Sequence, residues 1–157
     1  MRILIALGLA ATTAGCMAIP PAPEGPQVIS YETQNCFGAC PVYEVTVSSD
    51  GVGTFEGKEH VSALGIHHFT VTRGQFDAFA ATLAPWRPDG DRSLVDGACN
   101  GRIATDLDGV VVRWTDSGGS DRLSAYYGCD MEGNAAMFEA LRAAPRHLPI
   151  GAMIAGR

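Results

Sequence analysis

Basic residues are scarce in this sequence, and their scarcity limits the partners that we expect. Lys58 is the only lysine, and lysine and arginine together number 11 against 17 acidic residues, a formal charge of −6. Binding to nucleic acid needs clustered basic side chains that neutralise phosphates. We therefore expect no nucleic acid partner.

Long apolar runs are missing as well. The apolar run at the start, Ile3 to Ala11, gives way to small and polar residues before Cys16. Crossing a bilayer takes about 20 apolar residues, so this segment is too short for a transmembrane helix. A short apolar run that follows a basic residue and ends in small residues is typical of an export signal. The sequence predicts that residues 1–15 are a signal peptide and are removed.

The end of this leader, Thr13-Ala14-Gly15-Cys16, resembles the lipobox of bacterial lipoproteins, with Thr13 where leucine is commonest. The resemblance implies lipid on the thiol of Cys16 and cleavage just before it. Several acyl chains on one residue hold a protein to a bilayer almost permanently. Met17, rather than aspartate, follows the cysteine, and its resemblance to the sorting pattern of diderm bacterial lipoproteins implies the outer membrane, with the protein facing the periplasm. The proline-rich residues 16–27 are then a lipidated, semi-extended tether, and residues 28–157 form a single domain.

The chain has five cysteines. Cys36, Cys40, Cys99 and Cys129 remain once Cys16 is set aside. An even number of cysteines in an exported protein indicates disulfides. Four cysteines allow three pairings, and spacing alone does not choose among them.

The first part of the domain has the period-two pattern of β-strands. Tyr43, Val45 and Val47 alternate with polar residues, as in a half-buried strand. The cluster Ser48-Ser49-Asp50-Gly51 predicts a hairpin turn into a second strand, Val52 to Gly57. Further strands are predicted at His67 to Thr72, Val110 to Thr115 and Arg122 to Tyr127.

Two helices are expected. Thr72 and Gln75 match a capping box, and an apolar face follows until Pro85, made of Phe76, Phe79, Ala80 and Leu83. Asp130 is expected to cap a second helix, which carries the apolar stripe Met137, Phe138 and Leu141. Between them, Arg87 to Asp108 has no clear period. The order predicts an α+β fold, a disulfide-stabilised antiparallel sheet with helices packed on one face.

One string is distinctive, Asn35-Cys36-Phe37-Gly38-Ala39-Cys40-Pro41-Val42-Tyr43. With Asp50-Gly51 and Tyr126-Tyr127-Gly128-Cys129, it resembles the family named domain of unknown function 6438, from Val28 to Leu141. The resemblance implies a small bacterial α+β domain, often lipidated, and brings no activity. Since the motif carries Cys36 and Cys40 as a unit, we expect them to pair. Cys99 and Cys129 would then clamp the irregular stretch to the last strand.

The known catalytic patterns fit poorly. Thiol-disulfide enzymes place two residues between their cysteines at a strand-to-helix junction, but three stand between Cys36 and Cys40 and a strand follows. No G-x-S-x-G elbow is present. We therefore expect a non-catalytic binding or structural module without cofactors. The alternative is an envelope enzyme of thiol redox or hydrolytic type.

Metal binding has weak support. His67 and His68 are adjacent on a predicted strand, so they point to opposite faces and cannot share one zinc ion. The loop that holds Asp89 and Asp91 begins like a calcium loop but has Asn100, not glutamate, at its twelfth position. We expect no metal, although calcium stays open for this loop because Asp96, Asp106 and Asp108 follow.

The open face of the sheet is the candidate partner site. The residues predicted to face the helices are Val110, Val112 and Trp114 on one strand and Leu123, Ala125 and Tyr127 on the next. The alternation then places Arg113, Arg122, Ser124 and Tyr126 on the opposite face. Arginine and tyrosine dominate binding hot spots. We predict a binding face at Arg113, Arg122 and Tyr126 for an envelope protein, with the membrane bound through lipid on Cys16.

Overall fold

A computed structural model describes residues 25–155, apart from the side chain of Asp96. The predicted signal peptide, Cys16 and most of the predicted tether lie outside the described residues. No helix in the described part of the chain is both long and apolar enough to cross a bilayer.

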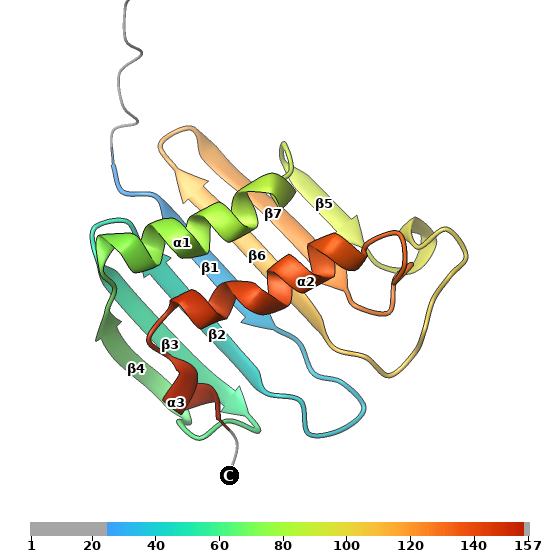
Figure 1. The fold of residues 1–157 in the computed structure, drawn as a ribbon, viewed down its shortest axis with the longest axis horizontal. Helices are drawn as coiled ribbons and strands as arrows, with labels where there is room; N and C mark the ends of the chain where they lie inside the picture. Colours follow the sequence, from blue (N-terminus) through green and yellow to red (C-terminus); the bar gives the residue numbers. More distant parts are fainter. Residues whose placement is uncertain (1–24, 156–157) are drawn as a thin grey trace, which may run out of the picture.

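A seven-stranded sheet forms the body of the domain (Figure 1), in the order β4-β3-β2-β1-β6-β7-β5. The strands are β1 Val28–Thr33, β2 Val42–Ser48, β3 Val52–Glu59, β4 Gly65–Thr70, β5 Asp91–Leu94, β6 Gly109–Asp116 and β7 Gly119–Tyr126. The turn between β2 and β3 has a hydrogen bond from the N–H of Gly51 to the carbonyl of Ser48, at 3.0 Å. Gly51 has a φ of 98°, which favours glycine. The predicted hairpin is confirmed.

Alternation along the central strands makes one face of the sheet the core. In β2 the residues Tyr43, Val45 and Val47 are buried, whereas the residues between them are only partly covered. Trp114 of β6 and Phe55 of β3 join them on the same side. The predicted inward set on β6 and β7, including Val112 and Leu123, is buried as expected.

Two helices lie across this face (Figure 1), α1 Arg73–Leu83 and α2 Ala135–Ala143. The capping box at the start of α1 is confirmed, because the hydroxyl of Thr72 accepts from the N–H of Gln75 and the Gln75 amide oxygen accepts from the N–H of Thr72. The apolar faces of both helices are buried in the core, with Phe79 and Leu141 fully covered. Short 3-10 helices, η1 Ala84–Trp86 and η3 Ala144–His147, follow α1 and α2.

The predicted fold class is wrong. The sheet is mixed, because β5 pairs with β7 in parallel while the other neighbouring strands are antiparallel. Within residues 25–155 the three α-helices have 11, 9 and 4 residues, so the sheet dominates the fold.

Backbone contacts explain the parallel strand that the sequence pattern missed. The N–H of Gly90 donates to Asp121 Oδ1 at 2.8 Å, and the N–H of Arg122 donates to the carbonyl of Gly90 at 3.0 Å. These bonds lead β5 along β7 after the chain has crossed the sheet as α1. A strand of four residues, only one of them buried, leaves no alternation to detect.

The last part of the chain differs from expectation at one helix start. Asn134, not Asp130, is the N-cap residue of α2. Asp130 has a φ of 40° and its carboxylate bonds elsewhere. After η3, the short helix α3 Gly151–Ile154 closes the described chain, and Leu148 and Ile150 are buried in the core.

Candidate functional site

Two disulfides stabilise the domain, as the sequence predicted. They join Cys36 to Cys40 and Cys99 to Cys129, the pairing expected from the motif. Cys99 and Cys129 are buried, whereas Cys36 and Cys40 are partly exposed. Strand β2, and not a helix, follows Cys40, so no helix terminus lies at this pair to favour a thiolate.

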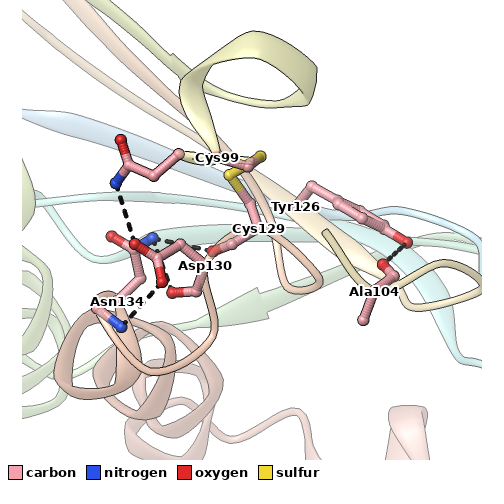
Figure 2. The surroundings of a disulfide bond; sticks show 8 residues. Cys99, Ala104, Tyr126, Cys129, Asp130 and Asn134 are labelled. Atoms are coloured by element: carbon pink, nitrogen blue, oxygen red, sulfur yellow. Dashed lines mark hydrogen bonds between the residues drawn. A yellow bond between two sulfur atoms is a disulfide. The ribbon is translucent and has the colours of Figure 1, made fainter. Parts of the chain in front are cut away.

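A network of hydrogen bonds lies around the Cys99–Cys129 disulfide (Figure 2). The carboxylate of Asp130 accepts from Asn100 Nδ2 at 3.0 Å, and Asn134 Nδ2 donates to the carbonyl of Cys129 at 2.9 Å. Arg102 Nη1 also donates to this carboxylate, at 3.4 Å. The hydrogen bond from Asn100 is the main reason that the pKa of Asp130 lies below its usual value. These groups bind one another, and their arrangement anchors the loop after β5 to the segment that leads into α2.

Tyr126, one of the predicted face residues, supports the same loop. Its hydroxyl donates to the carbonyl of Ala104 at 2.8 Å (Figure 2) and accepts from the N–H of Leu107 at 3.3 Å. The side chain is half-buried. The hydroxyl that was expected to meet a partner therefore holds the backbone of residues 104–107.

The two predicted arginines are brought together. Arg113 of β6 lies directly opposite Arg122 of β7 in the ladder, with Ser30 on the other side of Arg113 and Asp91 on the other side of Arg122. Arg113 is exposed and Arg122 is half-buried. Ser124, expected on the same face, is buried. The face is therefore open around the arginine pair.

An acidic row crosses the same face beside the arginines. Glu32 of β1 lies opposite Glu44 of β2, which lies opposite Glu56 of β3. Lys58 Nζ is 2.5 Å from Glu32 Oε1 and 3.6 Å from Glu44 Oε2. The hydrogen bond to Glu32 raises the pKa of Lys58. One half of the open face is thus acidic around a single lysine, and the other half carries the arginine pair.

A tyrosine cluster on the core side was missed by the sequence analysis. The rings of Tyr31 and Tyr43 stack with centroids 6.4 Å apart, and the hydroxyl of Tyr31 donates to the carbonyl of Leu141 at 3.0 Å. The guanidinium carbon of Arg142 lies 3.8 Å above the centroid of the Tyr127 ring. Alternation predicted that Tyr43 and Tyr127 point inward, but no local pattern shows that inward residues of distant strands meet.

Burial sets the ionisation of this cluster. Loss of solvation raises the pKa of Tyr127 to about 12, and for the same reason the pKa values of Tyr31 and Tyr43 lie well above that of a free tyrosine. All three hydroxyls are protonated at neutral pH and can donate hydrogen bonds.

The candidate metal ligands stay apart. Among the side chains that the structure describes, which leave out Asp96, no group of three or more histidine, cysteine, aspartate or glutamate residues is placed to hold a metal ion. His67 and His68 are both exposed, on opposite faces of β4. His68 Nδ1 lies 3.3 Å from the hydroxyl of Thr54, and His67 Nε2 lies 3.0 Å from the carbonyl of Leu64.

Comparison with known proteins gives the family but no activity. The model of one family, described as a domain of unknown function, matches residues 27–146. None of the curated proteins compared matches the chain. The matched segment runs from β1 through α2 into η3 and includes both disulfides, which is most of the chain. The chain therefore belongs to the family named domain of unknown function DUF6438.

Proposed function

We propose that this chain is a lipid-anchored envelope protein whose disulfide-bonded domain acts as a non-catalytic binding module. Lipid on Cys16 holds it to a membrane, most simply the outer membrane facing the periplasm, and the proline-rich tether lifts the domain off the bilayer. The leader sequence and the residues before Cys16 support the anchor. The two disulfides are consistent with an oxidising compartment.

The observation that carries the binding role is the arginine pair on the open face. Arg113 and Arg122 are directly opposed across two antiparallel strands, and like charges in this position destabilise a sheet. Among the described residues, neither guanidinium has a carboxylate within ion-pairing distance. An acidic surface on a partner would neutralise the two guanidinium groups and relieve the repulsion between them. The repulsion in the free domain therefore favours binding at this pair.

The charge pattern also fits a partner that binds in one orientation. The arginine pair and the acidic row lie on neighbouring strands of the same face, two residues apart along β1 and β6. Opposed patches of complementary sign steer a partner and suppress wrong orientations. We propose an envelope protein with a carboxylate cluster that faces the arginines and a basic group that faces Glu44 and Glu56.

Changing Cys16→Ala should abolish lipid attachment, because the thiol is the acylated atom. We expect the unmodified precursor to accumulate with its leader uncut by the lipoprotein route. Metabolic labelling with a palmitate analogue, followed by fractionation of the envelope, measures both effects. Cys36→Ala is the control for loss of a cysteine and should keep its label. Label retained on the Cys16 variant would exclude the proposed anchor.

Changing Arg113→Thr and Arg122→Thr together should remove the partner and leave the domain stable. Removal of the opposed charges and the strand propensity of threonine should raise the free energy of unfolding by several tenths of a kcal/mol. Crosslinking of the full chain in envelopes of the native host measures how much partner is bound, and urea denaturation measures the free energy of unfolding.

The matched control for this experiment removes two exposed arginines elsewhere, Arg73 and Arg146. A change of both to alanine alters the net charge equally but leaves the open face intact, so the crosslinked product should persist. If both double variants lose the product equally, net charge and not the arginine pair controls binding. If both keep it, the open face is not the site.

A further inference from the structure

Strand β4, Gly65–Thr70, lies at one edge of the sheet and pairs with β3 on one side only (Figure 1). An edge strand presents a row of unpaired backbone N–H and carbonyl groups along its free side. Among residues 25–155, no backbone hydrogen bond joins residues 65–70 to a segment other than β3. The free side of β4 can therefore pair with a further strand.

The two edges of the sheet differ in how they are protected. Short length, charged side chains, proline, bulges and covering loops are the features that keep an edge strand from pairing. The other edge strand, β5, has four residues and carries Asp91 and Arg92. By contrast, β4 has six residues, with no proline, lysine, arginine or carboxylate, and its ladder with β3 runs from Thr70 to Gly65 without a shift. Five of its six side chains are exposed, so no described segment covers this strand.

Exposed apolar side chains gather at the same edge. Ile66 of β4 is 66% exposed, and Leu64 just before the strand is 64% exposed. Val52 of β3, which lies opposite Thr70, is 58% exposed. Burial of apolar surface is the main favourable contribution to most protein association. A strand that paired with β4 would cover apolar surface as well as bind the free backbone groups.

Charge favours a second copy of this chain at the edge. The chain has a formal charge of −6, so the acidic surfaces of two copies repel each other. The segment from Val61 to Thr72 is different, because it contains no aspartate, glutamate, lysine or arginine. Two β4 strands can therefore lie side by side without like charges opposite each other, which would destabilise the pairing. A two-fold dimer is also the commonest form of protein assembly.

We propose that two copies of this chain pair through antiparallel β4 strands and join their seven-stranded sheets into one. The two-fold axis is perpendicular to the sheet, since this axis places the strands antiparallel and side by side. Each face then stays on its own side, so a residue pairs only with a residue of the same face. The fullest overlap of β4 with its copy places the axis at His67 or at His68. The arginine pair lies elsewhere, on β6 and β7.

Disulfide crosslinking in the native host tests this pairing. The variants His67→Cys and His68→Cys are made separately in the full chain, and intact cells are treated with a membrane-permeant thiol oxidant. One variant should give a disulfide-linked product of twice the chain's mass, because directly opposed strand residues have Cα atoms about 4.5 to 5.5 Å apart. The other should give about tenfold less, since its two cysteines are out of register and more than about 7 Å apart.

Matched variants locate the interface. Ser93→Cys is the control for an exposed cysteine on the other edge strand, β5, and it should give little of this product. Ile66→Lys, added to the productive cysteine variant, should lower the product about tenfold or more, because lysine on an edge strand prevents edge-to-edge pairing. Val95→Lys makes the same change of charge at an exposed apolar residue beyond β5 and should leave the product unchanged.

Three results would overturn the proposal. The first is that neither histidine position gives more product than Ser93→Cys. The second is an equal loss of product with Ile66→Lys and Val95→Lys, which would place the contact away from β4. The third is a linked product whose mass is not twice that of the chain, which would show that a different protein occupies this edge.

Discussion

Removal of the Cys99–Cys129 disulfide by a change of both cysteines to serine should lower the free energy of unfolding by about 3 to 4 kcal/mol. The bond closes a loop with a sequence separation of 30, and the entropy that a crosslink removes from the unfolded chain grows with the length of its loop. Both sulfur atoms are also buried, so two polar hydroxyls would replace them in the core.

The Cys36–Cys40 bond is the matched comparison, with a sequence separation of 4. The same relation gives about 2 kcal/mol for its removal. Urea denaturation of the purified full chain, in the parent and in each pair of serine variants, measures both losses. If removal of the Cys36–Cys40 bond lowered the free energy of unfolding as much as removal of the Cys99–Cys129 bond, or more, the entropic explanation would be contradicted. The Cys36–Cys40 bond would then stabilise the domain through packing.

Gly128→Ala should be the most damaging single change near this loop. A Cβ at Gly128 would lie 2.0 Å from the carbonyl oxygen of Ala104 and 2.5 Å from Cε1 of Tyr126. The carbonyl oxygen of Ala104 cannot move freely. The N–H of Ala104 donates to the carbonyl of Gly128 at 2.9 Å, and the hydroxyl of Tyr126 donates to the carbonyl oxygen of Ala104. We expect a loss of about 3 kcal/mol, the upper range for overpacking.

A second glycine provides the control for this change. Gly74 lies in the first turn of α1, and a Cβ there would meet nothing within 4 Å. Gly74→Ala should raise the free energy of unfolding by about 0.5 to 1 kcal/mol, because alanine loses less backbone freedom in a helix. Thermal denaturation of both variants measures the contrast. A Gly128→Ala protein as stable as the parent would show that the loop at residues 104–107 adapts.

Some of these features could be predicted because their causes lie within a few residues. The capping box at Thr72 needs only Gln75 three positions later. The buried stripe Met137, Phe138 and Leu141 follows from the helical period. The inward side chains of β6 and β7 follow from alternation with a period of two.

Other features escaped prediction because they depend on contacts between distant segments. The short strand β5 has no periodic pattern, and it is a strand because Gly90 bonds to Asp121 and Arg122 across the sheet. Asp130 was expected to cap a helix, but its carboxylate binds Asn100 and Arg102 from the disulfide-bonded loop. The hydroxyl of Tyr126 is likewise occupied by that loop.

Alternation and capping are local, so the sequence was enough to predict which way the residues of β2 and β6 point and where α1 begins. It also pointed to the family and to the cysteines that pair. Which inward and outward residues become neighbours depends on how the strands are ordered in the sheet. Arg113 meets Arg122, and Tyr31, Tyr43 and Tyr127 meet around one cavity, because strand order and register join residues far apart in the chain. Register depends on turn geometry and on which faces are buried together, and no single strand contains that information.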